Sequence, residues 1–350
     1  MPQLSAQPAH RRTIRVTGSG PTSGRTWAAV LTVLAVLTVL TASAAGTFAA
    51  SARTAPPAAG ATAAVPPTPA GLPTALEALS GYVPANSCDP HSKLGALAFG
   101  ELLRTAYPGS SYGAARACGT SPLPTSEHYD GRAIDWFRSV RTPAHKADAQ
   151  AALAWLFAVD KTGNRYANAR RLGVMYIIWN NKIWASYRTG DGWRPYSTCA
   201  THPSAAYDTA CHRDHVHFSL SWEGAMKRTS YWTKSVAAVD HGPCRAPDLN
   251  WAHPYSTART TPCPSYPRVT APASASALHK SLTTYSGMRL RTGSTGPSVR
   301  AVQSSVGASA DGNFGPATAT AVRSWQTRHN ITASGVIYYA TWRALLKATK

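Results

Sequence analysis

The sequence predicts an α+β domain, with a small antiparallel sheet and flanking helices, followed by a C-terminal three-helix bundle. Three observations lead to this prediction. Helical patterns occupy residues 94–159, strand patterns occupy residues 173–222, and helical spacing returns over residues 286–350. Helices that precede a group of strands, rather than alternating with them, are typical of the α+β class.

Each element of the first domain has its own signal. Apolar residues recur at helical spacing in two segments, and two later runs are rich in β-branched and aromatic residues around an Asn-Asn turn. The predicted helices are Leu94–Tyr107 and Ala147–Val159, and the predicted strands are Gly173–Trp179, Lys182–Ser186 and His215–Trp222.

The composition divides the chain into five parts. An arginine-bearing start, the apolar run Trp27–Leu40 and the small residues Ala42-Ser43-Ala44 predict a signal peptide over 1–50. The uncharged stretch continues to Ala52, so a retained membrane anchor is the alternative. We expect an Ala/Pro-rich linker over 51–75, the main domain over 76–253, a second linker over 254–285 and the bundle over 286–350.

The charge balance favours anionic partners. The chain carries 35 Lys and Arg against 15 Asp and Glu, a formal net charge of +20. We expect an exported monomer whose partners are peptidoglycan and anionic wall polymers, with a membrane contact only if the N-terminal segment is retained. We expect no nucleic-acid binding, because the charge is dispersed and no aromatic–basic RNA motif is present.

Six cysteines follow the predicted signal peptide, and none forms a Cys-x2-Cys pair. An even number in an exported chain indicates three disulfides rather than a thiolate metal site. Fifteen pairings of six cysteines are possible. Sequential pairing closes a short loop in each case, so we expect the bonds 88–118, 199–211 and 244–263.

Two motifs carry the chemistry. The run from Ser126 to Asp135 reads Ser-Glu-His-Tyr-Asp-Gly-Arg-Ala-Ile-Asp, and the run from Asp214 to Phe218 reads Asp-His-Val-His-Phe. Together they supply imidazoles and a carboxylate, the mixed donor set of catalytic zinc sites.

The two motifs must meet through folding. On a strand, His215 and His217 share one face while Val216 and Phe218 point to the core. His128 and Asp135 would lie roughly 23 Å apart if extended, at about 3.3 Å per residue, so the chain must turn back between them. Gly131 is the residue that permits such a turn.

The motifs resemble those of the zinc D,D-carboxypeptidases and endopeptidases of the VanY and VanX types. The wider superfamily includes lysostaphin-type and hedgehog-type domains, which carry His-x-His. The resemblance is carried by Ser-x-His-x-x-Gly-x-Ala-x-Asp and by Asp-x-x-His, about twenty residues in all. It implies a Zn²⁺ ion held by His128, Asp135 and His217.

The remaining motif residues have expected roles of their own. A proton must be carried to the leaving amine, and Asp214 or His215 could carry it, with a slight preference for Asp214. Ser126 could orient a ligand or bind the substrate backbone. Arg132 and Arg213 adjoin the motifs and could pair with a terminal carboxylate of the substrate.

Residues 286–350 resemble the three-helix peptidoglycan-binding module of wall hydrolases. The resemblance rests on a Gly-x-x-Gly-x-x-Val start, an Asp-Gly-x-Phe-Gly turn and a Val-x-x-Trp-Gln segment. The expected function is therefore that of a secreted zinc peptidase, a D,D-carboxypeptidase or endopeptidase, tethered to the cell wall. The alternative is a catalytically silent wall-binding protein that retains the metal fold.

Overall fold

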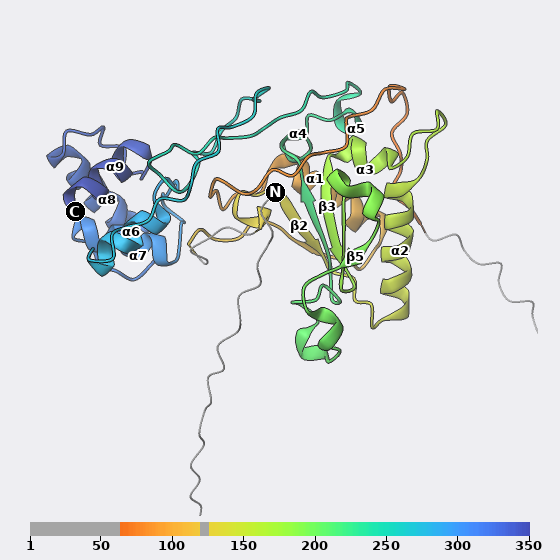
Figure 1. Ribbon diagram of the computed structural model, residues 1–350, viewed down its shortest axis with the longest axis horizontal. Helices are drawn as coiled ribbons and strands as arrows, with labels where there is room; N and C mark the ends of the chain where they lie inside the picture. The colour runs from red at the N-terminus through yellow and green to blue at the C-terminus, as the bar shows by residue number, and fades with distance from the viewer. Residues whose placement is uncertain (1–63, 120–125) are drawn as a thin grey trace, which may run out of the picture. The chain divides into compact units, whose positions relative to one another are not determined.

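The computed structural model describes residues 64–119 and 126–350. Within these residues, six strands form one antiparallel sheet in the order β1-β2-β6-β3-β4-β5 (Figure 1). The strands are β1 Tyr112–Gly113, β2 Ala133–Trp136, β3 Val174–Trp179, β4 Lys182–Ala185, β5 Arg194–Pro195 and β6 Val216–Leu220. Because β2 and β6 are neighbours, the two sequence motifs lie side by side.

Helices cover one face of this sheet. Phe99 of the first helix and Leu156 of the second pack in one core with Ile134, Ile177 and Phe218 of the central strands. The helices are α1 Leu94–Ala106, α2 Pro143–Phe157, α3 Ala167–Leu172, α4 Trp222–Ala225 and α5 Ser230–Thr233, with 3-10 turns η1 Glu127–Tyr129, η2 Ser186–Asp191, η3 Cys199–Thr201 and η4 Ala205–Tyr207. The α+β class predicted from the sequence is confirmed.

The β3–β4 hairpin and α2 illustrate what local sequence determines. Asn180 and Asn181 both have a left-handed backbone, with φ of 48° and 64°, as a two-residue hairpin turn requires. Helix α2 begins at Pro143, four residues before the predicted start. Proline suits the first helical position, and the first turn was missed because it carries no apolar stripe.

The Ala/Pro-rich segment expected to be a linker makes contacts with the domain that follows it. Over its described residues it lies against the domain, where Arg171 Nη2 donates to the carbonyl oxygen of Pro73 at 2.7 Å. The Tyr231 hydroxyl donates to the carbonyl oxygen of Pro67 at 2.6 Å. The predicted signal peptide lies outside the described residues.

The three helices predicted over residues 286–350 are present, and a further helix precedes them among the described residues. They are α6 Ala277–Tyr285, α7 Pro297–Val306, α8 Pro316–Arg328 and α9 Tyr339–Ala348. Helix α6 lies in the segment expected to be a linker, and its Leu282 is fully buried with Val302 and Trp342 in the core of the bundle. The Pro- and Ser-rich composition of residues 254–276 hid this short helix.

The helical module contains an internal repeat of 23 residues. Ser298–Gln303 reads Ser-Val-Arg-Ala-Val-Gln, and Ala321–Gln326 reads Ala-Val-Arg-Ser-Trp-Gln. Each buried glutamine fastens the turn that follows its helix. Gln303 accepts from the Gly312 amide at 2.9 Å, and Gln326 accepts from the Gly335 amide at 2.9 Å.

The three expected disulfides are present as Cys88–Cys118, Cys199–Cys211 and Cys244–Cys263. No cysteine of the described residues is free. Within those residues, no helix combines the length and apolar character needed to cross a membrane.

Candidate metal centre

Strand pairing places a carboxylate next to an imidazole. Asp135 of β2 is directly opposite His217 of β6, and directly opposed residues of an antiparallel pair share a face. Val216 and Phe218, which alternate with the histidines, are fully buried on the helix-covered face, as expected. The polar face of the central strands is therefore the face away from the core helices.

A tight turn brings the second imidazole to the same place. His128 lies in the 3-10 turn η1, which Ser126 caps by accepting from the His128 amide at 3.4 Å. Gly131 follows with φ of 79°, and a side chain there would lie 2.2 Å from the carbonyl oxygen of His91. Only glycine meets both constraints, so the chain reverses where the sequence predicted.

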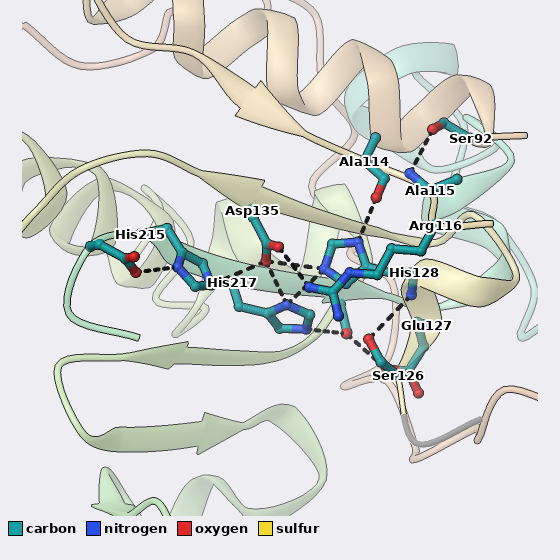
Figure 2. Close-up of polar contacts among 12 residues, drawn as sticks. Ser92, Ala114, Ala115, Arg116, Ser126, Glu127, His128, Asp135, His215 and His217 are labelled. Carbon is teal, nitrogen blue, oxygen red and sulfur yellow. Dashed lines mark hydrogen bonds and ion pairs between the residues drawn. The ribbon is translucent and has the colours of Figure 1, made fainter. Parts of the chain in front are cut away.

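Three side chains converge on one point (Figure 2). Oδ1 of Asp135 lies 3.0 Å from Nε2 of His128 and 2.9 Å from Nδ1 of His217, and the two nitrogens are 3.2 Å apart. All three residues are buried, and together they form a group that could hold a metal ion.

The outer hydrogen bonds define which nitrogen of each ring faces this point. Nδ1 of His128 lies 2.7 Å from the carbonyl oxygen of Ala114, which can only accept, so the proton is on Nδ1. Nε2 of His217 lies 2.9 Å from Oγ of Ser219. Because the Ser219 hydroxyl donates to the carboxylate of Glu127 at 2.9 Å, its oxygen accepts from His217. Both histidines therefore turn a bare lone pair inward.

Electrostatics keep these groups in the form that binds a cation. Burial raises the pKa of Asp135, but interaction with the His128 and His217 rings outweighs the effect of burial, so the pKa of Asp135 lies well below its usual range. Burial lowers the pKa of His217, which favours the neutral ring. Two lone pairs and a carboxylate oxygen within 3.2 Å repel one another unless a proton or a cation lies between them. The donor set of two imidazoles and one carboxylate fits zinc.

The second motif also forms an Asp–His pair beside the centre. His215 is buried, its Nδ1 lies 2.6 Å from Oδ1 of Asp214, and its Nε2 lies 3.4 Å from Oδ1 of Asp135. The Asp214 side chain is 37% exposed and lies behind His215 as seen from the centre. The carboxylate thus orients the ring, and the free nitrogen of the ring faces the site.

A pocket of about 330 Å³ opens onto the centre. Its lining includes four of the candidate site residues named in the sequence analysis, together with seven other residues: Arg116, Ser126, His128, Tyr176, Ile178, Tyr196, Thr209, Ala210, His212, His215 and His217. The Cys199–Cys211 disulfide closes the loop that carries Thr209 and Ala210, and His212 follows it directly.

Arg116 and His212 are site residues that sequence reasoning missed. Arg116 lies twelve residues before His128, and its Nη2 is 3.2 Å from Oδ2 of Asp135 while half of its side chain remains exposed. His212 has a left-handed backbone with φ of 52°, and burial together with the charges of His217 and His215 lowers its pKa to about 3. Nothing but proximity in sequence to His215 could have indicated His212.

The two arginines named beside the motifs have other surroundings. Arg132 is fully buried, donates to Asp130 at 2.9 Å and lies over the Trp222 ring. Arg213 is buried and donates to Asp208 at 2.6 Å. Neither lines the pocket, so a substrate contact by either one has no support in this geometry.

Comparison with known protein families gives two matches. A model described as the VldE C-terminal domain matches residues 88–207, and a model described as a putative peptidoglycan binding domain matches residues 295–345. The first match includes His128 and Asp135 but ends before His217. No curated protein and no solved structure matches the chain.

These matches cover the two regions that the sequence analysis separated. Together with the His–Asp–His centre, they support a wall-associated protein with a peptidase-like domain.

Proposed function

We propose that residues 76–253 form a zinc-dependent peptidase that acts on the peptides of peptidoglycan, and that the C-terminal module binds the enzyme to the wall. The observation that carries the proposal is the convergence of His128, Asp135 and His217 on one point with two bare nitrogens and an ionised carboxylate. Such a set of acceptors needs a cation, or a proton, between its members, and zinc fits the donor set.

Zinc, when bound by these three residues, supplies Lewis-acid activation of water and of a peptide carbonyl. The chain contributes the proton transfer. Asp214 accepts the Nδ1 proton of His215, which leaves Nε2 free to take a proton from water and to return it to the leaving amine. The distances support His215 as the proton carrier and Asp214 as its orienting partner.

Arg116 is the best candidate for contact with an anionic group of the substrate. One nitrogen of its guanidinium pairs with Asp135, and about half of the Arg116 side chain is exposed at the pocket. A guanidinium pairs well with a carboxylate, because its donors match the two oxygens. A terminal carboxylate at this position would favour carboxypeptidase action, whereas cleavage within a cross-bridge would use a different contact.

The wall-binding role rests on the match of residues 295–345 and on charge. Residues 286–350 carry eight Lys and Arg side chains against one acid, Asp311. The excess of positive charge favours attraction to anionic wall polymers and weakens with salt. Tethering raises the effective concentration of substrate near the pocket without any new catalytic contact.

Mass spectrometry of muropeptides tests the proposal. Purified peptidoglycan is incubated with the full chain, with a chelator and with the variants His217→Ala and His145→Ala, the latter altering a histidine of α2 outside the site. We expect chelator-sensitive loss of one alanine for a carboxypeptidase, or conversion of dimers to monomers for an endopeptidase. The wild type and His145→Ala should be active and His217→Ala inactive.

The same experiment separates the catalytic from the silent alternative. A protein that binds zinc and wall but leaves every muropeptide unchanged would contradict the proposed peptidase activity and favour a binding role. Activity that persists in His217→Ala would instead contradict the assignment of the metal ligands.

A further inference from the structure

A buried hydrogen-bond chain lies behind His217, on the side away from the metal centre. Nε2 of His217 donates to Ser219 Oγ at 2.9 Å, and Ser219 donates to Oε2 of Glu127 at 2.9 Å. The Tyr176 hydroxyl donates to the same carboxylate oxygen. Ser219 and Glu127 are fully buried, and Tyr176 is 7% exposed.

Sheet register assembles this chain. Ser219 follows His217 by two residues on β6, so both side chains share a face. Tyr176 of β3 is directly opposite Ser219, and its ring stacks on His217 with centroids 5.6 Å apart. Glu127 comes from η1, next to His128. These hydrogen bonds therefore link both sequence motifs behind the centre.

The buried carboxylate of Glu127 is not explained by packing alone. Oε1 of Glu127 has no hydrogen-bond partner among the described residues, and Nη2 of Arg132 is 4.0 Å away. A buried carboxylate whose one oxygen accepts no hydrogen bond is unfavourable for folding, even with the Arg132 charge 4.0 Å away, and an apolar group of the same shape would be better tolerated. Its position behind a proposed metal ligand points to a role toward the metal.

We propose that Ser219 and Glu127 are positioning residues that hold His217 with its proton on Nε2 and place a buried negative charge behind it, so that the centre binds a divalent metal more tightly. The proposal rests on the proposed function, since it concerns the same centre. Tyr176 fixes the carboxylate by donating to it. Partners of this kind typically change metal affinity by about 10–100-fold.

Zinc competition against a chromophoric chelator tests the proposal in the full chain. We expect Ser219→Ala and Glu127→Gln to raise the zinc dissociation constant about 10–100-fold, and Tyr176→Phe to raise it less. The matched control is Ser221→Ala, which removes the hydroxyl of another buried serine, one that caps α4 instead. Ser221→Ala should bind zinc like the wild type.

Nitrogen-15 spectra of the histidine side chains in the zinc-free chain give a second readout that a merely structural role would not change. The wild type should show His217 protonated at Nε2, and Ser219→Ala should lose that preference. Zinc affinity and tautomer unchanged in both Ser219→Ala and Glu127→Gln would overturn the proposal. Failure of the wild type to bind zinc would instead overturn the proposed function on which it rests.

Discussion

Two buried polar centres of this protein differ in whether the chain completes them. In the C-terminal module, Gln303 accepts from the Gly312 amide at 2.9 Å and donates to the Asn313 carbonyl at 3.0 Å and the Thr318 hydroxyl at 2.9 Å. In the first domain, His128, Asp135 and His217 bring three acceptor atoms together. When both rings are neutral and the carboxylate is ionised, no donor lies between them.

The comparison shows how a structural polar group differs from a functional one. The glutamine is satisfied within the fold, so its role is to fix a turn. The His–Asp–His centre is satisfied only by something added from outside, and the surrounding hydrogen bonds hold it in that state. Adding or removing zinc should therefore affect the first domain and not the C-terminal module, whereas removing a glutamine should affect the module and not zinc binding.

The largest expected effect is that of His217→Ala. The substitution removes one of the three proposed ligands, so bound zinc and the proposed peptidase activity should both be lost while the C-terminal module still binds the wall. Metal analysis by mass spectrometry and wall pull-down measure the two outcomes. A full complement of zinc in this variant would show that the ligand set is wrong.

Chelation should destabilise one region only. Zinc that binds the folded domain stabilises it by about 4 kcal/mol when its free concentration is a thousand times the dissociation constant. Differential scanning calorimetry should therefore show one transition that moves down on chelation and one, from the module, that does not. Two transitions that both ignore chelator would contradict the comparison.

Gln303 and Gln326, the two buried glutamines of the repeat, should contribute equally to the stability of the module. Gln303→Ala leaves the buried Gly312 amide without its partner, and Gln326→Ala does the same to Gly335. Each should lower the free energy of unfolding of the module by about 3 kcal/mol and leave zinc affinity unchanged. Chemical denaturation of each variant provides the measurement. Clearly unequal effects would show that the repeat is one of sequence alone.

The smallest expected effect is on pH dependence. Burial, with the charges of His217 and His215, lowers the pKa of His212 to about 3, so the unfolded chain binds a proton there before the folded chain does. Stability is thus lost as the pH falls below about 6.5, by roughly 2 kcal/mol at pH 5. Asparagine tolerates the left-handed backbone at this position and does not titrate, so the His212→Asn variant should lose less stability between pH 6.5 and pH 5 than the wild type. Chemical denaturation of the zinc-free wild type and variant at pH 6.5 and pH 5 tests this prediction. Equal losses of stability in the two proteins would contradict it.

The sequence predicted most of the centre because its signals are local. Alternation on β6 placed His215 and His217 on one face, and Gly131 indicated the turn. Alternation also argues against Arg132 as a site residue, since it lies three positions before Asp135 and so on the other face of the strand.

What escaped prediction depends on register and on distant segments. The chain from His217 to Glu127 exists because β3 pairs with β6 so that Tyr176 is opposite Ser219. Arg116 reaches Asp135 from a segment with no motif of its own. Helix α6 is short and lies in a Pro- and Ser-rich region, so packing rather than pattern reveals it.

Zinc K-edge X-ray absorption on the zinc-loaded full chain, with metal stoichiometry from the same sample, tests the central claim most directly. The account predicts one zinc per chain, bound by imidazole nitrogen and carboxylate or water oxygen with no sulfur, and lost in His217→Ala. A chain that takes up no zinc, or holds it through sulfur, would contradict the claim that His128, Asp135 and His217 form a metal centre.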